Sequence, residues 1–377
     1  MAKQRGHGEG SIYQRKDGRW AASITLEGRK RKTLYGKTRK EVQEKLRTAL
    51  YEQKQGLLAT GPRETVKHYL EYWLEEVHKP TIRISTYVRY QEIIQLHILP
   101  SIGHLQLQNL SPRHIQALYA KKVKEGLSAS TVQSIHAVLH KALDNAVRLG
   151  SLPRNVSDKI PLPRLTKHEI KSLTLEQAQH LLESVREHRL ESLFVLALST
   201  GMRLGELLGL KWQDINFADG TLQIRRILSY VRSKGFVESE PKTARSRRHI
   251  ILPAFVLESL KQHRVRQLEA KLKAGTFWED RDLVFCTAQG SYLNPVSTVQ
   301  DIFKAVLRKA GLPRMRFHDL RHSAATILLS MGVHPKVVQE LLGHSQISMT
   351  MDTYSHVLPT MQKDAMERMN EAFQKRT

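Results

Sequence analysis

The chain holds one cysteine, Cys286, among its 377 residues. A single cysteine excludes an intramolecular disulfide framework and a cysteine-rich zinc finger. No stretch approaches the ~20 consecutive apolar residues of a membrane-spanning helix. The basic, polar opening MAKQRGHGEG predicts no secretory signal. These absences favour a soluble, multidomain protein of the cytoplasm with no membrane partner.

Acidic residues are also scarce relative to basic ones. Asp and Glu number 36 against 60 Lys and Arg, which gives a net charge of +24 and a pI of about 10.1. An excess of this size favours a polyanionic partner such as nucleic acid. Ribosome-like or nonspecific surface basicity remain alternatives. With 40% hydrophobic residues the chain is too apolar to be disordered, and its length predicts two or three domains.

Residues 1–56 form the most basic segment, with 15 Lys and Arg against 6 Asp and Glu. Short strands followed by one helix are predicted here, at Ser11–Gln14, Trp20–Leu26, Arg31–Gly36 and from Thr38 to about Gln55. The Asp17-Gly18 pair is a strong hairpin signal. A three-stranded sheet with Arg and Lys on one face could enter a DNA major groove. A small domain with solvated charges is the alternative.

Two further segments follow, separated by linkers near Leu57–Arg63 and Leu152–Lys171. Residues 64–155 predict a compact block of about four helices, in which an early Trp and Tyr stripe belongs to the core. Residues 172–377 are mostly helical, with strands expected at Thr221–Ile224 and Arg248–Leu252 around a basic hairpin. The fold class is therefore mainly α with small β elements (α+β).

Four patches of the third segment carry the informative polar residues. They are Ser199–Leu210 with Arg203, Pro241–Ser246 with Lys242, Arg316–His322 with His318 and Arg321, and Leu341–Ser345 with His344, ten residues before Tyr354. We expect Arg203 at the start of a short helix, Lys242 at a hairpin tip, and the His-x-x-Arg pair on one helix face. Each of these residues could instead have a purely structural role. Glu206, for example, is a ready ion-pair partner for Arg203.

In order and local context, these elements resemble the tyrosine recombinase (phage integrase) family. The family pattern Arg…Lys…His-x-x-Arg…His…Tyr is complete, and Thr-Gly-x-Arg-x-Gly-Glu and Leu-Gly-His-Ser add specificity. The resemblance is strong over the last 200 residues or so. It implies a catalytic domain at 172–377, a helical core-binding domain at 64–155 and an arm-type DNA-binding domain at 1–56. The lysine is the least secure match, because Arg245, Arg247 and Arg248 are nearby basic candidates.

The residue chemistry agrees with this resemblance. Tyr354 offers a hydroxyl that can form a phosphodiester with DNA. Arg203 and Arg321 can clamp the phosphate oxygens with bidentate, permanently charged donors. His318 and His344 can donate hydrogen bonds or move protons. Lys242 can protonate the departing 5′-oxygen. The resulting 3′-phosphotyrosyl link conserves the bond energy, so neither ATP nor another cofactor is required.

The resemblance implies a recombinase that integrates or excises a mobile element. It would act as a homotetramer that binds two double-stranded DNAs at core and arm sites. It would be associated with the nucleoid, and an accessory DNA-bending or directionality factor could be a further partner. A catalytically silent DNA-binding regulator and a type IB topoisomerase are the alternatives. A metal site is disfavoured, because His318 and His322 lack the Glu of a zinc-hydrolase helix. A C-terminal helix over Leu358–Thr377 would pack on its own domain or on a neighbouring protomer.

Overall fold

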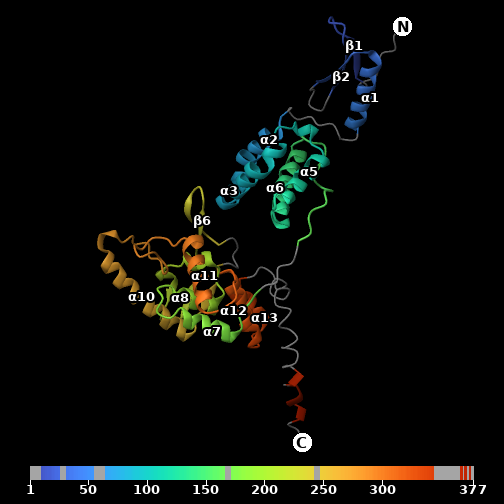
Figure 1. The fold of residues 1–377 in the computed structure, drawn as a ribbon. Coiled ribbons are helices and arrows are strands. Elements are labelled where there is room, and N and C mark those ends of the chain that lie inside the picture. Colours follow the sequence, from blue (N-terminus) through green and yellow to red (C-terminus); the bar gives the residue numbers. More distant parts are fainter. Residues whose placement is uncertain are drawn as a thin grey trace. The chain divides into compact units, whose positions relative to one another are not determined.

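The N-terminal part of the chain folds as a three-stranded antiparallel sheet with one helix (Figure 1). The structure is a computed structural model that describes residues 10–25, 31–54, 64–165, 171–241 and 247–343, with helical residues between 366 and 374. The first elements are β1 (Ser11–Gln14), β2 (Trp20–Thr25), β3 (Arg31–Gly36) and α1 (Arg39–Lys54), in the sheet order β1-β2-β3. Gly18, at φ +80°, closes the predicted turn between β1 and β2.

Helix α1 covers one face of this sheet. The small core between them consists of Ala22, Ile24, Val42, Leu46 and Ala49. On β3, Lys32 stands opposite the buried Ile24 while its neighbour Arg31 points to the other face. The prediction that the basic residues share one face is therefore wrong for β3, because strand residues alternate. Tyr13 and Tyr35 lie on the uncovered face, where the guanidinium of Arg15 stands 5.4 Å from the Tyr35 ring centre.

The second part is a block of helices, as predicted. Its elements are α2 (Val66–Tyr72), η2 (Trp73–His78), η3 (Lys79–Thr81), α3 (Ile84–Ile93), η4 (Ile94–Ile98), α4 (Leu99–Ile102), η5 (Leu107–Asn109), α5 (Pro112–Lys124) and α6 (Ala129–Arg148). The predicted Trp and Tyr core is confirmed for Tyr69 and Trp73, whereas Tyr72 is exposed. The Tyr69 hydroxyl donates to the Ala142 carbonyl oxygen at 2.8 Å, which ties α2 to α6.

The third part is mostly helical, with small antiparallel sheets. Its elements are α7 (Leu175–Ser184), α8 (Glu191–Thr200), α9 (Leu204–Leu208), η6 (Trp212–Asp214), β4 (Ile215–Asn216), β5 (Thr221–Gln223), β6 (Ile227–Val231), β7 (Gly235–Ser239), β8 (His249–Ile251), α10 (Ala254–Ala274), η8 (Gly275–Phe277), η9 (Pro295–Gln300), α11 (Asp301–Lys309), α12 (Asp319–Ser330) and α13 (Pro335–Leu342). One sheet has the order β4-β5-β8, and β6 pairs with β7 alone. The predicted fold class is confirmed.

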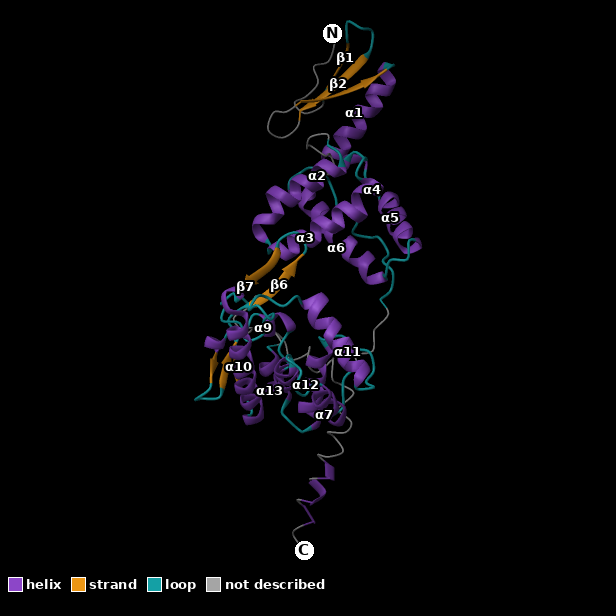
Figure 2. Ribbon diagram, turned by 60° about the vertical axis from the view of Figure 1, so that its left-hand side comes forward, coloured by secondary structure: helices purple, strands orange, loops and turns teal. Residues whose placement is uncertain are grey.

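Strands β6 and β7, which come between β5 and β8 in the chain, form a hairpin of their own (Figure 2). The pairing of Val231 with Gly235 places its turn at residues 232–234. Lys242, which is predicted at a hairpin tip before the strand near Arg248, follows β7 in the chain. Residues 242–246 themselves lie outside the described residues.

Helix α8 is the central element of the third part, and nearly all of its residues are buried. It contacts α7, α9, α10 and α12, and α12 in turn contacts α13. Contacts divide the chain into two units, residues 1–167 and 168–377. Within the predicted C-terminal helix, the described side chains Met366, Met369 and Phe373 are exposed. None of the described helices joins enough length to enough apolar character to span a membrane.

Candidate active site

A glycine turn between α8 and α9 places the first predicted arginine. Helix α8 ends at Thr200, and Gly201 follows in the left-handed conformation at φ 62°. A Cβ on Gly201 would stand 2.3 Å from Cδ2 of Leu342, so the position requires glycine for both its conformation and its contact. The chain then places Arg203 as the N-terminal cap of α9, as predicted.

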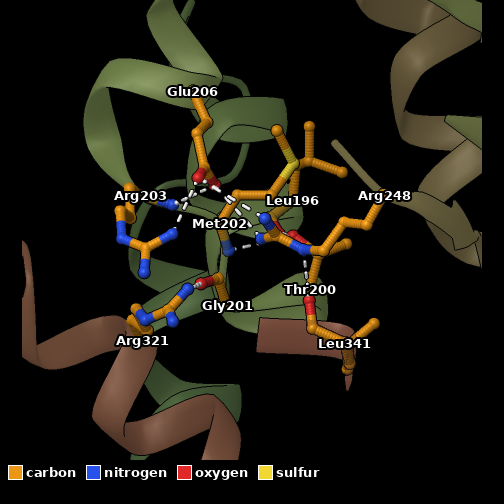
Figure 3. Close-up of polar contacts among 9 residues, drawn as sticks. All are labelled: Leu196, Thr200, Gly201, Met202, Arg203, Glu206, Arg248, Arg321 and Leu341. Atoms are coloured by element: carbon orange, nitrogen blue, oxygen red, sulfur yellow. Dashed lines mark hydrogen bonds and ion pairs between the residues drawn. The ribbon is translucent and has the colours of Figure 1, made fainter. Parts of the chain in front are cut away.

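The second predicted arginine reaches the same turn from α12. Arg321 is 3% exposed, and its Nη1 donates to the Gly201 carbonyl oxygen at 2.8 Å (Figure 3). Arg203 follows Gly201 by two residues and keeps 37% of its side chain exposed. The turn therefore brings two signature residues together although they stand 118 positions apart in the chain.

Glu206, on α9, holds Arg203 in place. Its Oε2 accepts from the Arg203 backbone N–H at 3.0 Å, and its Oε1 accepts from Arg203 Nη1 at 2.9 Å. The carboxylate is fully buried. Burial raises the pKa of Glu206, but the guanidinium of Arg248 and the hydrogen bonds from both arginines outweigh it, so the pKa lies below its usual range. The expected ion pair with Arg203 is thus present, and it orients the arginine.

The second glycine of the motif lets α9 approach strand β6. A Cβ on Gly205 would stand 2.8 Å from the Leu228 carbonyl oxygen and 2.9 Å from a methyl group of Ile227. Only glycine allows this contact between helix and strand backbone. The spacing Gly-x-Arg-x-Gly-Glu therefore combines a turn, a capping arginine, a close backbone approach and a carboxylate that holds the arginine.

Two of the basic alternatives to Lys242 are already engaged elsewhere. Arg248 is 8% exposed and pairs with Glu206 at 3.1 Å. Arg247 lies at the surface and pairs with Glu240 at 2.6 Å. Arg245 lies outside the described residues, as does Lys242.

His318 caps the start of α12, while Arg321 is buried one turn later. The helix face that His318 and Arg321 are predicted to share therefore has an exposed end at His318 and a buried end at Arg321. Burial, with the charges of His322, Arg321 and Arg316, lowers the pKa of His318 to about 4. Because the residue is still exposed to water, solvent screening reduces this shift. The pKa still lies below 6.5, so His318 is neutral at pH 7.

The remaining predicted site residues lie outside the described part of the chain. These are Lys242, His344 and Tyr354. Helix α13 ends at Leu342, and Gly343 caps it at φ 69°, directly before His344. Among the described residues, no group of three or more His, Cys, Asp or Glu side chains is placed to hold a metal ion.

Gly201→Ala is expected to lower the free energy of unfolding by roughly 2–4 kcal/mol, because alanine resists the left-handed conformation and Leu342 must move. Gly332 is the matched control, since it has φ +79° and a Cβ added there would meet nothing within 4 Å. Gly332→Ala should therefore show only the conformational cost of about 1 kcal/mol. Urea unfolding compares the two variants. Equal losses would mean that the contact with Leu342 does not matter.

The neutral state of His318 has a consequence for acid stability. Between pH 6.5 and 4 the unfolded chain binds a proton at this residue more readily than the folded one, so stability falls as pH decreases. His318→Gln should lose less stability than the wild type over this range. NMR titration of the ring protons should give a pKa below 6.5, and a value above 6.5 contradicts the expectation.

Comparison with known proteins agrees with this geometry. Residues 164–361 match the phage integrase family, and residues 65–123 match its N-terminal SAM-like domain. A XerC-like tyrosine recombinase of Caldanaerobacter subterraneus subsp. tengcongensis is 34% identical over 91% of this chain and 92% of its own length.

Solved structures share the fold. The Tn1549 transposon integrase, in complex with transposon right end DNA, aligns with a TM-score of 0.69 at 21% identity over 81% of this chain and all of that one. The lambda integrase tetramer bound to a Holliday junction aligns with a TM-score of 0.57 at 19% identity, over 93% of this chain and 96% of that one. From its sequence match and its fold, the chain belongs to the phage integrase family and is a tyrosine-type site-specific recombinase.

Proposed function

We propose that this recombinase cuts and rejoins double-stranded DNA through a 3′-phosphotyrosyl intermediate on Tyr354, and so integrates or excises a mobile element. In the cutting step the Tyr354 oxygen forms a bond to phosphorus, and the bond from phosphorus to the 5′-oxygen breaks. The tyrosine loses its proton, and the departing 5′-oxygen gains one. Rejoining reverses these changes with a different 5′-hydroxyl, so the bond energy is kept and no ATP is consumed.

The observation that best supports this proposal is the meeting of Arg203 and Arg321 at the Gly201 turn. Charge builds up on the non-bridging phosphate oxygens during attack. Two guanidiniums fixed beforehand, one by Glu206 and one by the Gly201 carbonyl, stabilise that charge without reorganising during the reaction. These cations come from side chains.

The other signature residues take the proton transfers. Neutral His318 can accept a proton or a hydrogen bond near the tyrosine, and His344 can donate to the phosphate. Lys242 supplies the proton for the 5′-oxygen, since an alkoxide leaves poorly. The engagement of Arg247 and Arg248 elsewhere supports Lys242 over these neighbours.

The relatives and the domain order support the partners that we propose. We assign residues 1–56 to arm-type DNA, 64–155 to core DNA and 172–377 to catalysis. The lambda integrase tetramer on a Holliday junction supports a homotetramer that joins two duplexes here as well. Because the protein would act on DNA, we assign it to the nucleoid and include an accessory DNA-bending or directionality factor among its partners.

Cleavage in excess EDTA without nucleotide tests the proposal. The DNA beside the coding region supplies candidate sites, which are made as nicked substrates that trap the covalent complex. We expect a covalent protein–DNA product whose yield EDTA does not change, because arginine and lysine side chains supply the charge and the acid. Loss of the product in EDTA with rescue by magnesium contradicts the mechanism. Relaxation of supercoiled DNA without junctions would indicate a topoisomerase, and binding without cleavage a silent regulator.

A further inference from the structure

Arg248 is a buried charge that the proposed chemistry does not use. It lies just before strand β8 and is 8% exposed. Its Nη1 and Nη2 donate to the two carboxylate oxygens of Glu206, at 3.4 and 3.1 Å. Burial lowers its pKa against the attraction of Glu206, yet a guanidinium stays protonated in proteins. An enclosed cation of this kind is costly unless its partners are fixed.

Its third contact lies at the end of α13. Arg248 Nε donates to the Leu341 carbonyl oxygen at 2.6 Å (Figure 3). Gly343, which caps α13, directs its N–H to the carbonyls of Gln339 and Glu340. Leu341 therefore belongs to the last helical turn, where carbonyl groups lack intrahelical partners and attract cations. The planar guanidinium fits both places at once, since its fork faces Glu206 while Nε faces the helix end.

Both carboxylate oxygens of Glu206 are engaged as hydrogen-bond acceptors. Each of its oxygens accepts one hydrogen bond from Arg203 and one from Arg248. A shift of Arg248 therefore moves the carboxylate that holds Arg203. Arg203 is the more exposed of the two arginines that Glu206 binds, with 37% of its side chain accessible against 7%.

We infer that Arg248 is a positioning residue that fixes Glu206, and through it Arg203, by anchoring both to the end of α13. This inference rests on the proposed function, in which Arg203 stabilises charge on the phosphate. Arg248 is buried, and the proposed chemistry gives it no contact with the DNA. It acts through the carboxylate, and lysine cannot replace it, because one ammonium cannot make three bonds in a plane.

Arg248→Lys tests the inference on two substrates. The first is the nicked phosphodiester site. The second carries a methylphosphonate at the cleaved position, which replaces one charged oxygen with a methyl group and reduces the need for Arg203. On the phosphodiester we expect a fall of about 100-fold in the single-turnover cleavage rate, as for a misplaced catalytic group. On the methylphosphonate the fall should shrink to about tenfold or less.

The ratio of the two rates separates positioning from folding. A smaller folded fraction lowers both rates by the same factor, so the ratio stays at its wild-type value even for a poorly folded variant. Arg247→Lys is the matched control, because this neighbour makes a surface ion pair whose loss changes rates by less than about fivefold. Arg203→Lys/Arg248→Lys should be no slower than Arg203→Lys alone on the phosphodiester.

Two results overturn the inference while leaving the proposed function intact. One is a wild-type rate for Arg248→Lys on the phosphodiester. The other is an equal loss on both substrates, together with additive losses in the double variant. Failure of the wild type itself to form a covalent product contradicts the proposed function instead.

Discussion

Tyr354→Phe is expected to abolish the covalent protein–DNA product and to leave DNA affinity nearly unchanged. The substitution removes the proposed nucleophilic oxygen and leaves the phosphate contacts of the other signature residues in place. Loss of a nucleophile that acts together with its neighbours lowers the rate by at least about 10⁴-fold. The nicked suicide substrate measures the product, and a gel-shift titration on the same DNA measures binding.

Tyr230→Phe serves as the control for this experiment. Tyr230 lies on β6, is 44% exposed, and packs edge-on against Phe236 with ring centres 5.2 Å apart. Its hydroxyl has no part in the proposed chemistry, so this variant should form the covalent product at the wild-type rate. A covalent band from Tyr354→Phe would move the nucleophile to another tyrosine, with Tyr13 and Tyr51 among the candidates.

The surroundings of Arg203 could be predicted from the sequence because its signals are local. The glycine that ends α8, the start of α9 and the pairing with Glu206 all lie within six residues. Each follows from a conformational preference or from i, i+3 spacing. The same holds for the Asp-Gly turn between β1 and β2, and for the buried aromatic side chains of α2 and its continuation.

Contacts between distant segments could not be predicted in this way. Arg248 and Glu206 are 42 positions apart, and no local pattern pairs a basic residue before a strand with a glutamate on a helix. From the sequence, Arg248 is therefore only an alternative to Lys242. Gly205 signals only the close approach of β6 to α9 and says nothing of Arg248, which precedes β8. Strands β6 and β7 are predicted only as a basic hairpin, because their short apolar runs flank the charged residues Arg232 and Lys234.

Lysine in place of Arg203 or Arg321 is expected to lower the single-turnover cleavage rate by at least about 100-fold, since each change removes a bidentate donor to the phosphate. The two variants should differ in stability. Arg321 is buried and bonds the Gly201 carbonyl, so Arg321→Lys should also lower the melting temperature. Arg203 is more exposed, and its backbone N–H still donates to Glu206 in the lysine variant, so Arg203→Lys should melt close to the wild type.

Arg316→Lys is the matched control for both changes. Arg316 precedes His318, is 74% exposed and pairs with Asp319 at 2.8 Å. Lysine keeps the positive charge at this exposed position, and the backbone N–H of residue 316 still donates to Asp319, so the rate should stay within about fivefold of wild type. Stopped reactions on the nicked substrate, at saturating protein, give the three rates. Rates within about tenfold of wild type for both Arg203→Lys and Arg321→Lys would remove these arginines from the phosphate clamp. A defect in Arg321→Lys alone, with a lowered melting temperature, would reduce its role to supporting the Gly201 turn.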